Sequence, residues 1–304
     1  MPTPMRSNDF RPIVEPILNE AFDGIYDLRK DEWKGVFREV QGIKRAYHEE
    51  PVLFGMGAAP ELPEGNPVTY QSGGVLFNKR YVYKVYGLAF ALTKVLMEDG
   101  DAISIGQIMA RHLANALIET KETLTANILN RAFNGSYLGG DGVALCVSTH
   151  PIQGGTASNV LATAANLSQT SVEQMCIQIR QAVDNNGKRA KLEPKALVTS
   201  PSNIFQGEVI LNSALRSGTN NNDINPLKTM RLLADGQHNI SRLTSTTAWF
   251  IKTGVQEGLK VVMRRALQKS MEGDFETDSM RHKATERYDV GWTDWRDIYG
   301  TPGV

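Results

Sequence analysis

The sequence predicts an α+β fold, and three patterns support this prediction. Apolar residues recur at helical spacing over one stretch from Ser104 to Phe133. Near the C-terminus, apolar and polar residues alternate from Met280 to Trp292, which is typical of a half-buried strand. Between these stretches, helix and strand candidates do not follow one another as regular βαβ units. Helices and strands should therefore occupy separate parts of the fold.

Composition and charge are those of an ordinary folded protein and exclude several classes. The 304 residues are 41% hydrophobic and 22% charged, so long disordered regions are not expected. Lysine plus arginine and aspartate plus glutamate number 33 each, which leaves no basic footprint for strong nucleic-acid binding. The two cysteines do not make a disulfide scaffold, and no apolar secretory segment follows the start, so folding in the cytoplasm is expected.

Residues 1–50 are interpreted as an arm and not as a self-sufficient domain. Pro12 and Pro16 should limit any helix before Ile17, because proline lacks the amide N–H that a helix interior needs. The apolar side chains of this stretch are few, and the arm is expected to dock on other surface. They are Ile13, Ile17, Leu18, Phe22 and Ile25.

Residues 51–87 are interpreted as a long hairpin or extended loop. Glycine and proline crowd the part up to Gly74, and β-branched and aromatic residues dominate the following VLFNKRYVYKVYG. An apolar ribbon of this kind cannot bury itself alone and is expected to find apolar surface on another chain. The side chains predicted to share its apolar face are Val75, Phe77, Tyr81, Tyr83 and Val85.

The helix predicted over 104–133 is unusually long. At ~1.5 Å per residue it would span about 45 Å, whereas helices in globular proteins average about 11 to 12 residues. One side carries the apolar stripe, and the other carries polar residues such as Arg111, Glu119 and Arg131. The polar side excludes a membrane span, so the helix should pack on one face and meet water on the other.

Shorter elements are predicted between the long helix and the last strand. Ser171 and Gln174 make a possible capping box, from which a helix should run until Gly187. A second helix is predicted from Ser202 to Leu211, and the polar RSGTNNNDINP should be a loop. The strand candidates are residues 196–199, 227–233, 248–253 and 259–267.

No catalytic, cofactor-binding or metal-binding residues are predicted. Cys146 and His150 are four residues apart, and a cysteine nucleophile needs a nearby base, but the proline and glycines around the pair favour a buried cysteine and a turn histidine. The five histidines are dispersed and lack metal-site spacing. Arg264, Arg265 and Lys269 are followed at once by acidic residues, which favours a solvated mixed-charge surface with at most nonspecific nucleic-acid contact.

Four segments occur in a suggestive order: NKRYVYKVYGLAFALTKVLMEDG, LANALIETKETLTANILNRAF, DGVALCVSTHPIQGGTASN and TERYDVGWTDWRDIYGTPG. Together they resemble the major capsid (head) protein of tailed bacteriophages with the HK97-type fold, over roughly residues 78–303. The third segment looks most like the family, in which a D-G-x-x-L-x-S-x-x-H-P-type stretch follows the long helix.

The resemblance implies a division of the chain. The implied parts are an N-terminal arm at 1–50, an extended loop at 51–87, a peripheral domain at 88–167 and 260–304 with a spine helix at 104–133, and an axial domain at 168–259. The arm and the loop would provide contacts between subunits, and the tips of the axial domain would meet around the symmetry axes. The candidate contact residues are Val75, Phe77, Tyr81, Tyr83, Val85, Ile13, Ile17 and Phe22.

The implied function is structural and not enzymatic. Copies of the chain would assemble as hexamers and pentamers into an icosahedral head shell around double-stranded phage DNA, without cofactor or membrane. Scaffolding, portal and decoration proteins are further possible partners, with a separate scaffold or none, because no long scaffolding segment precedes the loop. Lys79 in the ribbon is interpreted as solvated, so no covalent crosslink is predicted. The protein would reside in the virion after assembly in the host cytoplasm.

Two alternatives remain open from the sequence. An encapsulin-like compartment would share the fold but enclose a cargo enzyme instead of DNA. A cytosolic hydrolase using Cys146 and His150 belongs to a different class, and a thiol that is inert in the folded protein would exclude it.

Overall fold

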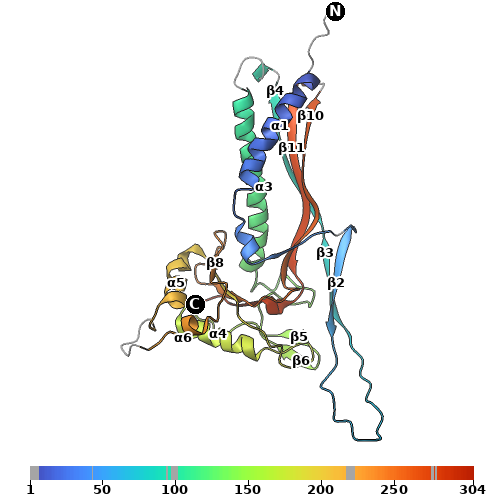
Figure 1. The fold of residues 1–304 in the computed structure, drawn as a ribbon, viewed down its shortest axis with the longest axis vertical. Coiled ribbons are helices and arrows are strands. Elements are labelled where there is room, and N and C mark those ends of the chain that lie inside the picture. The colour runs from blue at the N-terminus through green and yellow to red at the C-terminus, as the bar shows by residue number, and fades with distance from the viewer. Residues whose placement is uncertain are drawn as a thin grey trace, which may run out of the picture.

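The computed structural model of the protein describes residues 7–42, 44–93, 95–96, 102–216, 223–274, 277 and 279–304, and the side chains of residues 7–13 and 102 lie outside that description. The molecule is elongated (Figure 1). A rod of long strands and two helices, here called the long unit, lies above a smaller part, here called the compact unit. A hairpin projects downward beside the compact unit and beyond it.

The long unit is a four-stranded sheet with two helices along one face. Its strand order is β1-β10-β11-β4, with β1 parallel to β10 and the other neighbours antiparallel. The helices α1 and α3 lie side by side along the strands (Figure 1). The bounds are β1 Arg38–Val40, β4 Lys84–Thr93, β10 Leu259–Asp274, β11 Ser279–Trp292, α1 Ser7–Tyr26 and α3 Ala102–Asn130.

The two longest predicted elements are confirmed. The helix α3 runs for 29 residues, and its apolar stripe, which includes Leu113 and Leu117, is buried. Along β11, the side chains of Met280, His282 and Ala284 are buried, and the residues between them are exposed. The α+β class is confirmed with them, because the helices pack on one face of a mainly antiparallel sheet.

The prediction that prolines would limit a helix before Ile17 was wrong. The helix α1 runs without interruption from Ser7 to Tyr26. Its side chains Leu18 and Phe22 are fully buried in a core shared with α3, β10 and β11. Burial of such side chains stabilises the helix by about 1.5–3 kcal/mol each. This gain offsets the free energy lost because two prolines remove backbone hydrogen bonds from the helix. The leading segment is therefore docked on its own subunit.

The compact unit contains a second sheet, of order β12-β9-β7-β8, and its described residues also form three helices. Its core includes Met175 and Ile179 of α4 together with Trp249 and Tyr299 of the sheet. The last strand, which the resemblance assigns to the peripheral domain, pairs with β9 in this sheet. The bounds are β7 Ala196–Thr199, β8 Gln237–Asn239, β9 Trp249–Lys252, β12 Ile298–Thr301, α4 Gln169–Gln181, α5 Ile204–Asn212 and α6 Pro226–Met230.

Two local predictions for the compact unit need correction. The segment 227–233, predicted as a strand, begins with the helix α6, because the Asn225 side chain accepts a hydrogen bond from the N–H of Leu227 and Pro226 occupies the first turn. The capping box of α4 is formed by Ser168 and Ser171, and the helix ends at Gln181, before Gly187. The strands β7 and β9 and the helix α5 are confirmed.

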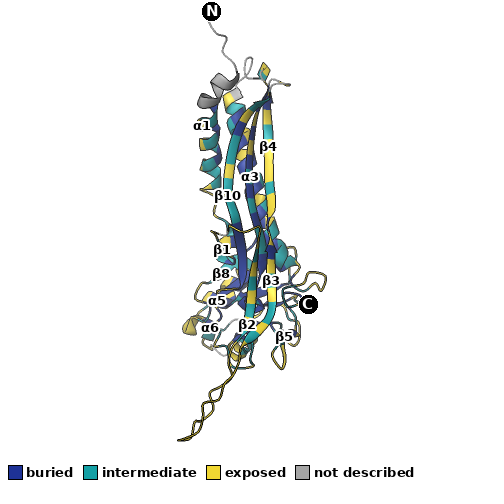
Figure 2. Ribbon diagram, turned by 90° about the vertical axis from the view of Figure 1, so that its right-hand side faces the viewer, coloured by how far each residue is buried: buried dark blue, intermediate teal, exposed yellow. Residues whose placement is uncertain are grey.

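The projecting hairpin consists of β2 (Tyr47–Phe54) and β3 (Gly74–Val82), which pair antiparallel, and of the loop 55–73 between them. Its long loop extends away from both units (Figures 1 and 2). The remaining short elements are η1 Glu32–Gly35, β5 His150–Ile152, β6 Gly155–Ala157, η2 Pro201–Asn203 and η3 Trp295–Asp297.

Candidate assembly surfaces and the joint between the units

The projecting hairpin exposes apolar side chains that the described part of its own subunit leaves uncovered. Tyr70 is 95% exposed, and the other large apolar side chains of the loop are also exposed. The loop carries Glu61 and Glu64 and no lysine or arginine. Exposed apolar groups in one continuous segment are typical of an interaction surface. They are Leu53, Met56, Leu62, Val68, Tyr70 and Val75.

The base of the hairpin is fixed by both units. Lys260 Nζ in β10 donates to Glu50 Oε2 at 2.5 Å, and Thr293 Oγ1 donates to the same oxygen. Burial opposes ionisation of Glu50, but these hydrogen bonds outweigh it and lower the pKa of its carboxyl group. From the compact unit, Asn185 Nδ2 donates to the carbonyl of Leu53 at 2.8 Å. The direction in which the loop projects is therefore set at its base.

The candidate contact residues separate into exposed and buried sets. Val75 and Val85 are 55% and 59% exposed, and Phe77 and Ile17 are half-buried. Tyr81, Tyr83 and Phe22 are buried inside the subunit, which leaves no surface for a second chain. The Ile13 side chain lies outside the described residues.

Tyr81 and Tyr83 are buried because β3 turns into the body of the protein at its C-terminal end. The Tyr81 hydroxyl lies 2.7 Å from Thr293 Oγ1, and both tyrosines pack with Val262 of β10. Burial raises the pKa of the Tyr81 hydroxyl well above its usual value. The strand alternates as predicted, but its inner face meets β10 and β11 of the same chain and not a neighbour, so we exclude these two tyrosines from the contact set.

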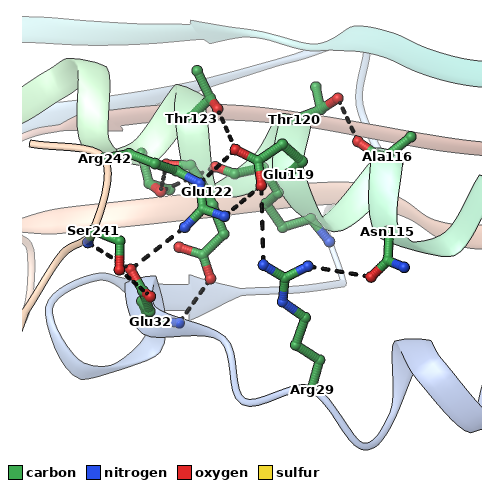
Figure 3. Close-up of polar contacts among 12 residues, drawn as sticks. Arg29, Glu32, Asn115, Ala116, Glu119, Thr120, Glu122, Thr123, Ser241 and Arg242 are labelled. Atoms are coloured by element: carbon green, nitrogen blue, oxygen red, sulfur yellow. Dashed lines mark hydrogen bonds and ion pairs between the residues drawn. The ribbon is translucent and has the colours of Figure 1, made fainter. Parts of the chain in front are cut away.

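A charged cluster joins the leading segment, the long unit and the compact unit (Figure 3). Arg242, from the loop between β8 and β9, forms ion pairs with Glu119 of α3 and with Glu32 of η1, the latter at 3.4 Å. Glu32 also accepts hydrogen bonds from the N–H and hydroxyl of Ser241, at 2.8 and 2.6 Å. Arg29 donates a hydrogen bond to Oδ1 of Asn115, which also lies in α3, at 3.2 Å. We call Arg29, Glu32, Glu119, Glu122 and Arg242 the Arg242 cluster.

Glu122 is the buried member of the Arg242 cluster. Its Oε1 accepts a hydrogen bond from the N–H of Glu32 at 2.7 Å, and its Oε2 is buried without a hydrogen-bond partner among the described residues. Burial raises the pKa of this carboxyl group, and the neighbouring Glu32 carboxylate adds to the effect. The loop after Arg242 is also tied to α3, because Asn130 Nδ2 donates to the Arg242 carbonyl at 3.0 Å.

Cys146 and His150 do not form a nucleophile and base. Cys146 is buried, and burial raises the pKa of its thiol far above the usual value, which opposes formation of the thiolate. The His150 ring instead forms hydrogen bonds with the side chains of Asp141 and Asn159, and it stacks on the ring of Trp295. The stretch that most resembles the capsid family thus supplies packing and hydrogen bonds between the units.

The end of the compact unit carries a second set of exposed apolar side chains. Phe205 of α5 is 83% exposed, and its neighbours along α5 and α6 are exposed as well. The set lies on both sides of residues 217–222, which are outside the described part of the chain. Its members are Phe205, Val209, Leu215, Ile224 and Met230.

The described residues contain neither a membrane-spanning helix nor a metal-binding cluster. Within those ranges, no helix combines the length and the apolar character needed to cross a bilayer. The same residues contain no group of three or more histidine, cysteine, aspartate or glutamate side chains placed to hold a metal ion.

Comparison with known proteins identifies the family and the fold. A family model described as phage capsid protein matches residues 79–300, from β3 to β12. None of the curated proteins matches the sequence. A virus-like particle protein from Pyrococcus furiosus is similar in structure, with a TM-score of 0.54 and 12% identity over 94% of this chain and 98% of that one.

Two bacteriophage shells show the same likeness. The procapsid of bacteriophage JBD30 gives a TM-score of 0.52 at 14% identity, over 95% of this chain and 74% of that one. The capsid of Myoviridae phage XM1 gives 0.51 at 11% identity, over 89% and 90%. At such identities the likeness concerns the fold, and it confirms the expected HK97-type capsid fold. Because the family model spans most of the sequence, the chain belongs to the phage capsid protein family.

Proposed function

We propose that this capsid protein assembles with copies of itself into a closed head shell that encloses phage double-stranded DNA. The observation that carries the proposal is the projecting hairpin, whose loop exposes its apolar side chains and is not covered by the described residues of its own subunit. The loop is acidic and apolar, and its base is fixed by both units, so it can reach a neighbouring copy in a defined direction. Membership of the capsid family supports the same function.

The end of the compact unit is the second proposed contact. Exposed side chains such as Phe205 and Ile224 would be buried if several copies met there, as the axial tips of the family do. Of the contact residues predicted from the sequence, Val75 and Val85 are exposed. Val75 belongs to β3 of the hairpin, and Val85 belongs to the edge strand β4. The leading helix is not included, because its described side chains Val14, Leu18 and Phe22 are already buried against α3 and the long sheet.

Shortening the hairpin tests the proposal. Deletion of 58–73 leaves Gly55, Met56 and Gly57 as a three-residue turn between the paired residues Phe54 and Gly74. The subunit should stay folded and fail to form particles in negative-stain microscopy and sedimentation. A second variant, in which residues 58–73 are replaced by glycine and serine, keeps the length of the loop and removes its apolar side chains. It shows whether assembly depends on the length of the loop or on its side chains. Normal shells from both variants would contradict the assigned role.

The content of the particle distinguishes the proposed virion from a cargo compartment. The open face of the long sheet carries exposed Arg281 and Lys283, but Glu272 and Asp274 lie on the same sheet, so contact with DNA should be weak and nonspecific. Purified particles should contain nuclease-protected double-stranded DNA. Particles that hold a packaged protein and no DNA would favour the encapsulin-like alternative.

We also propose that the protein has no catalytic function. The only thiol near a histidine in the described sequence, Cys146, is buried and resists ionisation. An electrophilic thiol probe should therefore leave Cys146 unlabelled in the folded protein, whereas rapid labelling would restore the hydrolase alternative.

A further inference from the structure

Two arginines lie directly opposite each other on neighbouring strands of the long sheet. Arg265 of β10 is the register partner of Arg287 of β11. Along β11, Ala284 and Tyr288 are buried on the side of the helices, so Arg287 belongs to the open face, which lies away from α1 and α3. Like charges at opposed positions destabilise a sheet. Such a pair becomes favourable when an anion lies against it.

A β-bulge brings a third arginine to the same place. The register of β10 shifts by one residue just before Arg265, so that Arg264 and Arg265 together stand opposite Arg287. Arg265 donates to Thr285 Oγ1 on the open face at 3.1 Å. Arg264 donates to the backbone carbonyl of Arg45, also at 3.1 Å. The irregular strand thus gathers three positive charges in one small area.

No carboxylate of the described residues pairs with these three arginines. The Nε atoms of Arg265 and Arg287 are buried and have no hydrogen-bond partner within that part of the chain. Asp289 lies two residues further along the same face, but its carboxylate already accepts from the N–H groups of Val82 and Val290, at 2.9 and 3.0 Å. A guanidinium group that is partly withdrawn from water without an acceptor is unfavourable.

Tyr83 adds an unpaired hydroxyl group beside the arginines. Its side chain is only 5% exposed and packs on Val262 of the same face, and its hydroxyl has no hydrogen-bond partner among the described residues. Arg264 and Arg287 act electrostatically on this hydroxyl, which places the three groups together. Burial raises the pKa of Tyr83, so the hydroxyl stays protonated and can donate. We call Tyr83, Arg264, Arg265 and Arg287 the arginine site.

We propose that the arginine site binds an oxyanion, and that in the shell this oxyanion is a glutamate carboxylate from the projecting loop of a second copy. The inference rests on the proposed function and names the surface that receives the loop. Guanidinium N–H groups and a tyrosine hydroxyl suit a carboxylate because all of them donate hydrogen bonds and the arginines carry the opposite charge. A bound carboxylate would also offset the repulsion between Arg265 and Arg287.

The projecting loop has the matching charge and surface. Its Glu61 and Glu64 are exposed and form no ion pair with the described residues, and 55–73 contains no lysine or arginine. Beside the arginine site, the exposed Val85 of β4 pairs with Arg287 and offers apolar surface for the loop's apolar side chains. The loop of the same chain is too distant: β3 has 9 residues and spans about 30 Å at ~3.3 Å per residue, and the loop points away from the long unit (Figures 1 and 2).

A nucleic acid fits the open face less well than a single carboxylate. Glu272 and Asp274 of β10 and Asp289 of β11 lie on this face and would repel a row of phosphates. One glutamate side chain requires only the local group of positive charges. The observations therefore favour a carboxylate of another copy.

Arg287→Gln separates a binding role from a structural one. Arg287 forms no hydrogen bond or ion pair with the described residues, so its replacement relieves repulsion without breaking a contact. In a urea titration of unassembled subunits, the folding equilibrium constant should be unchanged or up to about fivefold higher. The amount of sedimentable particles, at equal soluble expression, should fall at least about tenfold. A folding constant lowered by more than about threefold, or full particle formation, would overturn the inference.

A double-mutant cycle identifies the source of the carboxylate. Glu61→Gln or Glu64→Gln should by itself reduce particle formation about as much as Arg287→Gln does, because either change removes the same ion pair. Combined with Arg287→Gln, that glutamate variant should cause no further loss, since partners of one interaction do not add. Lys283→Gln is the matched control, because it removes an exposed positive charge from the same strand and face, and it should stay within about threefold of the parent.

The possible outcomes distinguish this inference from the proposed function. A parent protein that forms no particles would refute both. If the parent assembles and neither glutamate variant lowers the yield, or if the losses multiply in the combined variants, the loop carboxylate is not the occupant and only this inference falls. An equal loss from Lys283→Gln would reduce the effect to general surface charge and would also overturn it.

Discussion

Replacement of Arg242 by methionine should weaken the joint between the long and compact units by a measurable and modest amount. Arg242 is the only residue of the described Arg242 cluster that comes from the compact unit, and its side chain is 17% exposed. Methionine keeps most of the side-chain stem and removes the ion pairs with Glu119 and Glu32. The hydrogen bond from Asn130 to the Arg242 carbonyl is a backbone contact and survives the change.

The magnitude follows from the exposure of the two partners. The Glu119 side chain is 53% exposed, so solvent screening limits that pair to roughly 0.5–1 kcal/mol. The Glu32 pair, at 3.4 Å and 33% exposed, should contribute less. The change also removes the positive charge that offsets the repulsion between the Glu32 and Glu122 carboxylates. The expected total is a loss of about 1–2 kcal/mol in the free energy of unfolding.

A urea titration of unassembled subunits, followed by the fluorescence of the four buried tryptophans, measures this loss. Because ion pairs at partly exposed sites are screened, the difference should shrink in high salt. Arg29→Met, which removes a more exposed arginine from the same cluster, should cost under about 0.5 kcal/mol. A loss below about 0.3 kcal/mol for Arg242→Met, or a loss unaffected by salt, would refute the electrostatic account.

Three further outcomes are expected from residues at other positions. Leu18→Ala should lower the free energy of unfolding by about 2–5 kcal/mol because the Leu18 side chain of α1 is fully buried against α3, whereas Leu28→Ala, at an 82% exposed position, should change it by less than about 0.5 kcal/mol. The Glu122 pKa is raised in the folded state, so its contribution to stability is present at low pH and lost as the pH rises through the folded value; Glu122→Gln should therefore stabilise the subunit at pH 7, and its advantage should disappear in acid. Burial raises the pKa of the Cys176 thiol to about 12, so iodoacetamide at pH 8 should label it only after unfolding, and fast labelling of native protein would contradict its burial.

Elements with a long and regular pattern were predictable from the sequence. The stripe of α3 and the alternation along β11 repeat over many turns or residue pairs, so chance matches are unlikely to imitate them. The helix α1 was not predictable in the same way, because its stability comes from α3 and β10, which lie far from it in sequence. The Asn225-Pro226 pair before α6 was a visible helix-start signal that the apolar run after it obscured.

The contacts that join the units could not be predicted, for a physical reason. Glu32, Glu119 and Arg242 are each ordinary surface residues in their local sequence, and only the folded chain brings them together (Figure 3). Tyr81 illustrates the same limit, since its partner Thr293 lies beyond the end of β11. Alternation along a strand shows that one face is apolar, but it does not show whether the covering surface belongs to the same chain or to another.

The position of α1 changes which parts of the chain remain available for assembly. If the leading segment were free, it could share the work of joining subunits with the hairpin. Because Leu18 and Phe22 are buried on α3, its release would expose that core and cost several kilocalories per mole. The projecting loop and the end of the compact unit release no core when they bind, since their apolar side chains are already in water. Burial of those side chains in the proposed assembly would not require any loss of core packing, and this difference makes them the more favourable contact candidates.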